Sequence, residues 1–81
     1  MPRYSVETQL SADRAIQEAV KYFGPGGLGL ELVDQESCCA DFEGGGGHVS
    51  VRVVTGETTN VNLETREWDY HVKQFMRQLQ E

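Results

Sequence analysis

Residues 65–79, TREWDYHVKQFMRQL, form the stretch on which the fold depends. Its apolar residues follow an i, i+4, i+7, i+8, i+11 spacing, which is typical of one face of an amphipathic helix rather than of a strand. They are Trp68, Val72, Phe75, Met76 and Leu79. Thr65 is placed to cap this helix, and Asp69 puts negative charge in the early turns, where the helix dipole favours it. We therefore expect a closing helix whose apolar face packs against the preceding residues.

The front of the chain predicts a strand followed by a helix. Residues 3–10 alternate, with Tyr4, Val6, Thr8 and Leu10 on one face, which indicates a half-buried strand. Ser11 stands at the N-cap position before apolar residues that repeat at helical spacing over residues 12–23. The glycines and proline of residues 24–27 end that helix, because glycine tolerates the left-handed C-cap conformation and proline cannot continue a helix.

The middle of the chain predicts four further strands. Apolar and polar residues alternate over residues 28–33, 38–43, 48–54 and 59–65. Polar or glycine-rich stretches separate them: Asp34–Ser37 as a turn or the end of the strand, Gly44–Gly47 as a flexible hairpin connection, and Thr55–Glu57 as the next turn. Short connections dictate antiparallel pairing of these strands.

The resulting order is β-α-β-β-β-β-α, an α+β domain spanning residues 1–81. We expect a curled antiparallel sheet with both helices packed on one face, because the sheet and the helices each have an apolar face to bury. The predicted inward set is Tyr4, Val6, Leu10, Ile16, Val20, Phe23, Leu30, Leu32, Cys38, Ala40, Phe42, Val49, Val51, Val53, Val61, Leu63, Trp68, Val72, Phe75, Met76 and Leu79, with Thr59 and Thr65 as further candidates.

Composition and length limit the class of protein. With 81 residues, of which 38% are hydrophobic and 25% charged, the chain resembles an ordinary soluble domain near the lower size limit for a single core. Oligomerisation is therefore expected to be one way of adding stability. No apolar run approaches a membrane span, and residues 1–7 lack the apolar region of a signal peptide. We expect a cytoplasmic protein that does not contact a membrane.

The charge balance argues against nucleic acid as a partner. The net charge is −6, with 7 lysines and arginines against 13 acidic residues, and the basic residues form no run. Binding to a phosphate backbone depends on such basic residues. We therefore expect no nucleic-acid partner.

The element order of the whole chain resembles the helix-grip superfamily, which includes START-type lipid-transfer proteins and polyketide cyclases. The residues that carry this resemblance are SVETQLSADRA (5–15), a strand leading into a Ser-capped helix, and EWDYHVKQF (67–75), a closing helix. The resemblance implies a ligand cavity between the last helix and the sheet. The same order also resembles one half of the TATA-binding-protein fold.

Two groups of residues are weighed as chemical sites. Gly44–Gly47 resembles a phosphate-cradling loop only superficially, because a valine-rich strand follows where a helix N-terminus is needed. Cys38 and Cys39 with His48 are candidate metal ligands. Adjacent strand residues point to opposite faces, however, so we expect Cys38 in the core, Cys39 exposed, no metal and no cofactor. A disulfide between neighbours closes no useful loop, which favours reduced thiols and a reducing compartment.

The histidines suggest no catalytic centre. His48 and His71 are the side chains whose ordinary pKa lies near neutrality. His71 borders the apolar face of the closing helix, but the sequence supplies neither a nucleophile nor an oriented partner. We assign no catalytic residues and favour a protein that is not an enzyme.

Two functions from different classes remain. The first is a non-enzymatic association module, either a homodimer or a subunit that binds another protein. Its interface would involve sheet-edge and open-face residues such as Val33, Val54 and Arg52. The second is a small module that binds an apolar ligand in a groove between the closing helix and the sheet. The predicted lining of that groove is Phe23, Phe42, Trp68 and Phe75.

Overall fold

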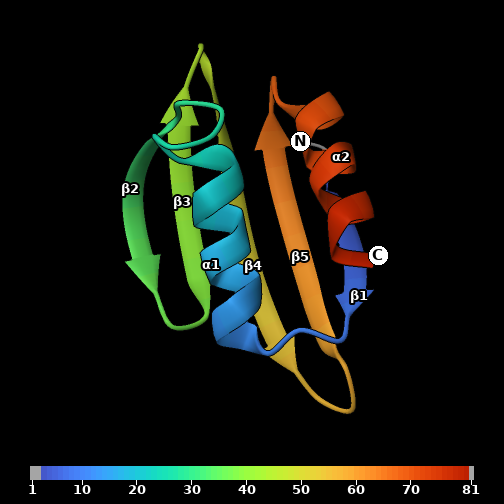
Figure 1. Ribbon diagram of the computed structural model, residues 1–81. Helices are drawn as coiled ribbons and strands as arrows, with labels where there is room; N and C mark the ends of the chain where they lie inside the picture. Colours follow the sequence, from blue (N-terminus) through green and yellow to red (C-terminus); the bar gives the residue numbers. More distant parts are fainter. Residues whose placement is uncertain (1–2, 81) are drawn as a thin grey trace.

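The computed structural model describes residues 3–80 and shows a five-stranded antiparallel sheet with two helices (Figure 1). The elements are β1 (Arg3–Thr8), α1 (Ala12–Phe23), β2 (Glu31–Glu36), β3 (Cys39–Gly44), β4 (Gly47–Thr55), β5 (Thr59–Arg66) and α2 (Asp69–Gln80). The strand order is β1-β5-β4-β3-β2, so β1 and β2 form the two edges. The predicted order and α+β class are confirmed. Met1 and Pro2, where the signal-peptide expectation begins, lie outside the described residues.

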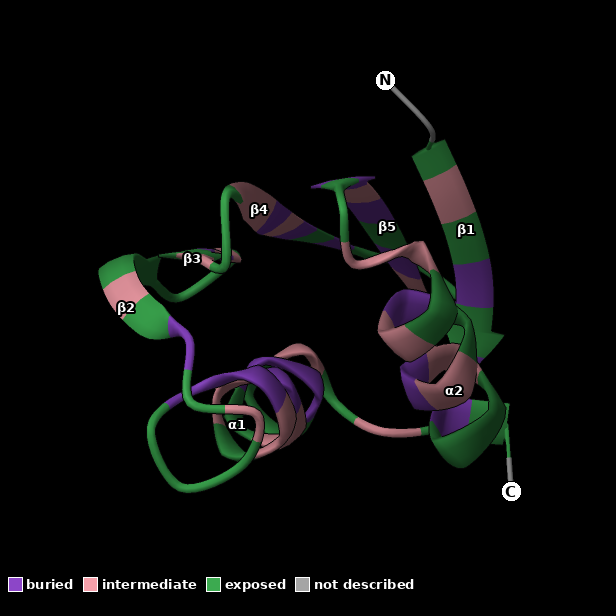
Figure 2. Cartoon of the chain, turned by 90° about the horizontal axis from the view of Figure 1, so that it is seen from above, coloured by how far each residue is buried: buried purple, intermediate pink, exposed green. Residues whose placement is uncertain are grey.

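The sheet curls around the two helices. Viewed from above, the strands form an arc, and α1 and α2 both lie on its inner side (Figure 2). Inward residues therefore alternate with residues on an outer face that neither helix covers. Along β5 the inward residues Thr59, Val61, Leu63 and Thr65 are all buried. This alternation is the period of two that the sequence predicts.

Helix α1 begins and packs as its sequence requires. The backbone N–H of Arg14 donates to the Ser11 side chain at 3.3 Å, so the predicted N-cap is confirmed. Ala15 and Ala19 are fully buried, as small side chains on the face that approaches the sheet. The contacts of α1 are with β3 and β4, near the centre of the sheet.

The end of α1 differs from the expectation. Gly24 is extended, with a φ of −74°, and is not left-handed. The loop instead closes by backbone hydrogen bonds, including Leu28 N–H to Tyr22 O at 2.9 Å and Leu30 N–H to Phe23 O at 3.0 Å. Gly29, with a φ of 87°, is the glycine in this loop that takes the left-handed conformation.

Of the two alternatives for residues 34–37, a turn or the end of a strand, the structure shows strand for the first three residues. The acid-rich residues from Asp34 to Glu36 belong to β2, and the turn is Ser37-Cys38. A bulge between Leu32 and Asp34 leaves Val33 unpaired. It places Asp34 and Glu36 opposite the outward residues Asp41 and Cys39 of β3. Polar side chains are tolerated here because β2 is an edge strand.

The four glycines make a tight turn rather than a flexible connection. Gly44 pairs with Gly47 as the last pair of β3 and β4. Gly45 and Gly46 form the turn, with φ values of 57° and 81°. Positive φ at both central residues defines the two-residue hairpin turn that suits the twist of the strands.

Strand β5 continues through the residues expected to start the last helix. Thr65 is buried in the strand and donates its hydroxyl hydrogen bond to His48 O at 2.8 Å, so the predicted cap at Thr65 is wrong. Arg66 still pairs with His48. Glu67, with a φ of 76°, then reverses the chain. The helix begins only at Asp69, and Trp68 O accepts its first backbone bond, from Val72 at 2.9 Å.

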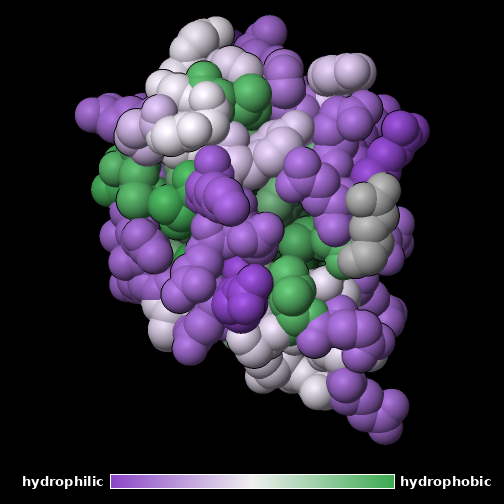
Figure 3. All heavy atoms as spheres, viewed as in Figure 1, coloured by the Kyte–Doolittle hydropathy of each residue, from purple (hydrophilic) through white to green (hydrophobic). Residues whose placement is uncertain are grey.

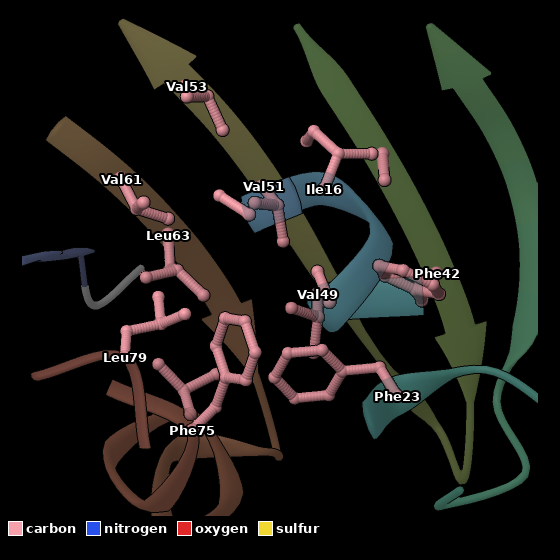
Figure 4. Packing of buried hydrophobic residues seen from close by; sticks show 14 of the residues in the cluster. Ile16, Phe23, Phe42, Val49, Val51, Val53, Val61, Leu63, Phe75 and Leu79 are labelled. Carbon is pink, nitrogen blue, oxygen red and sulfur yellow. The ribbon is translucent and has the colours of Figure 1, made fainter. Parts of the chain in front are cut away.

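The core fills the space between the helices and the inner face of the sheet (Figure 4). The buried apolar residues are Val6, Ala15, Ile16, Ala19, Phe23, Leu30, Ala40, Phe42, Val49, Val51, Val53, Val61, Leu63, Val72, Phe75 and Leu79. Most of the predicted inward set is confirmed. Tyr4, Leu10, Val20, Leu32, Trp68 and Met76 are only partly buried and pack around this core. Cys38 is the clear exception, because it lies exposed in the β2–β3 turn.

Replacing Gly47 by alanine should destabilise the fold by about 2 kcal/mol or more. A Cβ at this position would lie 2.0 Å from the backbone oxygen of Arg66, and backbone atoms in a paired strand cannot give way cheaply. Urea unfolding of Gly47→Ala measures the loss. Gly26→Ala is the matched control, because a Cβ there meets nothing within 4 Å. Equal stability of the two variants would contradict this packing.

Candidate interaction surface

The outer face of the sheet carries polar side chains in rows across the strands. One row consists of Arg3, Glu64, Ser50, Asp41 and Asp34, and the next of Ser5, Asn62, Arg52, Cys39 and Glu36. Val54 is an apolar member of this face and is 58% exposed. The exposed positions expected for Val54 and Arg52 are confirmed, and Val33 is exposed at the β2 bulge.

Charge is unevenly distributed over this outer face: the charged residues of β2 and β3 are all acidic, whereas the other strands carry arginines together with Glu7 and Glu64. The acidic side, on β2 and β3, carries Glu31, Asp34, Glu36, Asp41 and Glu43. The arginines, Arg3, Arg52 and Arg66, belong to β1, β4 and β5. Asp34 and Asp41 lie directly opposite one another, which is unfavourable for like charges. Arg52 offsets this repulsion by an ion pair with Asp41 at 3.1 Å.

A shallow hollow of about 490 Å³ lies on the outer face of β1, β5 and β4. Its lining includes Arg3, Ser5, Arg52, Asn62 and Glu64. Both arginines are paired with carboxylates: Arg3 lies 2.9 Å from Glu64, and Arg52 is bonded to Asp41. The hollow therefore offers little unbalanced positive charge to an anion.

The two edges of the sheet have different chemistry. Strand β2 presents exposed acidic residues and is interrupted by the bulge at Val33. Strand β1 is regular and pairs with β5 over its whole length. Its exposed residues are Arg3, Ser5 and Glu7, and the Arg3 side chain is 81% exposed. The backbone groups of an unpaired edge can pair with another strand unless charge or an irregularity prevents it. On β2 the acidic residues and the bulge prevent such pairing, whereas β1 has no bulge and no row of like charges.

Helix α2 fixes the inner side of β1. The Tyr4 hydroxyl donates to the Asp69 carboxylate at 2.6 Å, at the start of the helix. The Thr8 hydroxyl donates to Leu79 O at 2.9 Å, at its end. The Lys73 ammonium lies 5.7 Å from the centre of the Tyr4 ring, within the range of a cation–π contact. These contacts connect β1 to α2 near both ends of the helix.

The hydrogen bond to Asp69 is the main cause that raises the pKa of Tyr4 above its ordinary value of 10.0, and burial and the charge of the carboxylate add to it. A neutral phenol donates to the carboxylate, whereas an ionised one repels it. The folded state therefore holds this proton more tightly than the unfolded state does. The resulting stabilisation is present below about pH 10 and is lost as the pH rises above it.

We accordingly expect Tyr4→Phe to be less stable than the unmodified protein near neutrality, and the difference to shrink as the pH rises through about 10. Urea midpoints measured between about pH 8 and pH 11 test this dependence. Tyr70→Phe is the control, because Tyr70 is 68% exposed. A constant difference across this range would show that the Tyr4–Asp69 bond does not contribute as described.

Three of the four predicted ligand-lining residues meet in the core. Phe23, Phe42 and Phe75 are each fully buried. The Phe23 ring lies 5.1 Å from that of Phe75 and 5.6 Å from that of Phe42, measured between centroids. Figure 4 shows the rings of Phe23 and Phe75 next to each other, and their planes are inclined at 61° in an edge-type contact. An apolar ligand at this place would have to separate the rings, so the ligand-binding role of these residues remains a prediction.

Trp68 lies apart from the three phenylalanines. Its indole N–H donates to Gly44 O at 2.9 Å, and a Cβ at Gly45 would come within 2.8 Å of its ring. The ring thus covers the β3–β4 turn and ties it to the start of α2. This position was expected on the apolar face of a helix, but it precedes the helix.

The two cysteines are joined by a disulfide, contrary to expectation. The prediction assumed that both lie in a strand, where neighbouring side chains diverge. Cys38 instead lies in the turn, so the two sulfur atoms converge. Cys39, the first residue of β3, is half-buried on the outer face opposite Arg52. The prediction of reduced thiols is therefore wrong, and the cysteines do not indicate a reducing compartment.

His48 lies on β4 opposite Arg66, and His71 lies in the first turn of α2. His48 Nε2 lies 4.0 Å from a Glu64 carboxylate oxygen on the outer face. The ring of His71 lies 5.3 Å from those of Trp68 and Tyr70, beside the helix start. The two histidines belong to different surroundings. Among the described residues, neither imidazole ring is hydrogen-bonded to a hydroxyl or thiol, and the Thr65 hydroxyl contacts only the backbone oxygen of His48.

The helix side of the surface is mostly hydrophilic. Figure 3 shows hydrophobic atoms, in green, only as separated patches on the face seen there. Within residues 3–80, neither helix has the length and apolar character needed to cross a membrane. The features that stand out in this chain are therefore the β1 edge, the outer face of the sheet and the cysteine pair.

No protein-family model matches the sequence, and a search of curated proteins gives no match. Any function must be argued from the geometry of the chain itself.

Proposed function

We propose that the protein is a non-enzymatic association module and that two copies pair through the outer edges of β1. The observation that supports this proposal is the difference between the two edges. One edge is complementary to itself, and the other repels itself. A chain of 81 residues also has more to gain from a second copy than a large domain does.

Self-pairing of β2 is unfavourable for electrostatic reasons. Its exposed residues include Glu31, Asp34 and Glu36, so a second copy of β2 would bring carboxylates beside carboxylates. The bulge at Val33 further breaks the regular spacing of backbone groups. Both features are common devices that prevent association at an edge.

Self-pairing of β1 is favourable in one register. An antiparallel pair centred on Ser5 places Arg3 opposite Glu7 of the partner subunit, and Glu7 opposite Arg3 of the partner subunit. On the inner side, Tyr4 lies opposite Val6 of the partner subunit. Each side chain stays on its own face in this register, because residues with the same parity are paired. The arrangement is isologous and closes as a dimer.

The backbone and the charged side chains contribute differently to the proposed dimer. Backbone hydrogen bonds between the two β1 strands supply affinity, as in other cases of strand addition. The exposed Arg3–Glu7 pairs contribute only about 0–1 kcal/mol each, because they are solvated and Arg3 also interacts with Glu64 of its own chain. Their effect is to select the register, because other registers lose the opposite charges or bring like charges together.

A cysteine at position 5 tests the register directly. In antiparallel pairs, directly opposite Cα atoms lie about 4.5–5.5 Å apart, which is within reach of a disulfide. Ser5→Cys, in a background where Cys38 and Cys39 are serine, should form a covalent dimer on mild oxidation. Asp34→Cys in the same background is the matched control at the other edge and should stay monomeric. Cross-linking at position 34 alone would contradict the proposed edge.

Charge reversal tests the complementarity. Arg3→Glu and Glu7→Arg should each weaken the dimer, and the double variant should restore it, because opposite charges again face each other. Sedimentation equilibrium over a hundredfold range of concentration measures the effect, with Asp34→Arg as the control. A monomer at every concentration of the unmodified protein would overturn the proposal.

A heterologous protein partner that adds a strand to β1 would use the same edge. A small apolar ligand between α2 and the sheet is the second candidate, but the closed packing of Phe23 and Phe75 gives it no support. The cytoplasmic location is also carried forward as a proposal.

A further inference from the structure

The turn between β2 and β3 places two sulfur atoms and a carboxylate together. The ligand atoms of Glu36, Cys38 and Cys39 all lie within 4.8 Å of one another. Glu36 and Cys39 are the closing pair of the hairpin, and Cys38 lies between them in the turn. Glu36 and Cys38 are exposed and Cys39 is half-buried, so the group is accessible from solvent.

The backbone holds these three residues in place. Cys38 O accepts a hydrogen bond from Val53 N–H at 2.8 Å, which ties the turn to β4. Cys39, on β3, pairs with Arg52 of β4. The side chains can therefore rearrange while the positions of their Cα atoms stay fixed.

We propose that reduction of the Cys38–Cys39 disulfide opens a site for a thiophilic divalent cation, such as Zn²⁺ or Cd²⁺, with Glu36 as the third ligand. Two thiolates and one carboxylate suit such ions, and water would complete a tetrahedral set. At about 2.3 Å from a tetrahedral ion, two sulfur atoms are about 3.8 Å apart. Rotation of the cysteine side chains on this turn can supply that separation once the sulfur–sulfur bond is broken.

The charges around the turn favour a cation. Arg52 is ion-paired with Asp41 near the turn, but Asp34 and Glu36 carry carboxylates there that no ion pair among the described residues neutralises. Their combined potential concentrates cations near the turn. Hard ions such as Mg²⁺ are poorly matched to thiolates, so the site should discriminate against them.

The site is closed in the oxidised form, because a disulfide offers no thiolate. Opening it requires a dithiol as reductant. One thiolate of the reductant attacks a disulfide sulfur and forms a mixed disulfide. Its second thiol then displaces the protein sulfur, so the protein gains two electrons and two protons and the reductant becomes a disulfide. Metal binding then releases the thiol protons, so the apparent affinity falls as the pH is lowered.

The test compares the two redox states of the unmodified protein. After reduction with dithiothreitol and its removal without oxygen, titration with Cd²⁺ should show one equivalent bound, seen as a thiolate-to-metal ultraviolet band. The disulfide form should show no such band. Circular dichroism of both forms checks that the fold is retained. Absence of binding by the reduced protein, or equal binding by both forms, would overturn the proposal.

Variants then assign the ligands. Cys38→Ser and Cys39→Ser should each abolish the band, and Glu36→Gln should weaken binding about tenfold or more. Asp34→Asn is the matched control, because it removes a charge of the same hairpin from a residue that does not belong to the group of three. This variant should bind Cd²⁺ almost as well as the unmodified protein. Undiminished binding by Glu36→Gln would remove Glu36 from the site. Binding that survives loss of either cysteine would contradict the two-thiolate site.

Discussion

The contact between Phe23 and Phe75 is the interaction on which the arrangement of this small fold depends. It joins the end of α1 to the middle of α2, two helices from opposite parts of the sequence, and Phe42 closes against it from β3. All three side chains are fully buried. Truncation of one such residue typically costs about 3–5 kcal/mol, a large part of the total stability of a domain. A chain of this length has few other means of keeping both helices over one sheet.

The same contact determines where function can reside. Since the aromatic rings fill the space between the helices and the sheet, binding surfaces are left to the periphery. There the chain uses its edges differently. The regular β1 edge can accept a strand, whereas the bulge and carboxylates of β2 resist one. In the proposed pairing only the β1 edge is used, so the assembly would close at two copies and would not continue into a fibre.

Much of this architecture could be predicted because the periods of hydrophobic residues are clear. The alternation of apolar and polar residues along β4 and β5, and the helical spacing of apolar residues along α1, correspond to observed elements. The errors arise where pairing overrides local composition. Thr65 belongs to β5 because the ladder to β4 continues past it, although its position suggested a helix cap. Residues 34–36 extend β2, which is one of the two alternatives that their composition left open.

The candidate sites were less predictable for a related reason. The residues of the β1 edge are visible in the sequence, but their exposure depends on the strand order, which places β1 at the margin. The prediction for the cysteine pair assumed that both residues lie in a strand, but β3 begins at Cys39 and Cys38 lies in the turn before it. A polar stretch before the pair offered no signal to distinguish a bulged strand from a turn.

The position of β1 also has a consequence for how the chain is made. Its sheet neighbour is β5 and its covering helix is α2, so its hydrogen bonds to Glu64, Asp69 and Leu79 span 61, 65 and 71 residues of sequence. On the ribosome, the first strand emerges long before either partner exists. It must stay unpaired while the hairpins of β2, β3 and β4 can already form. Contacts of such long range slow folding, so the nascent strand needs protection from premature pairing until residues near 80 have been added.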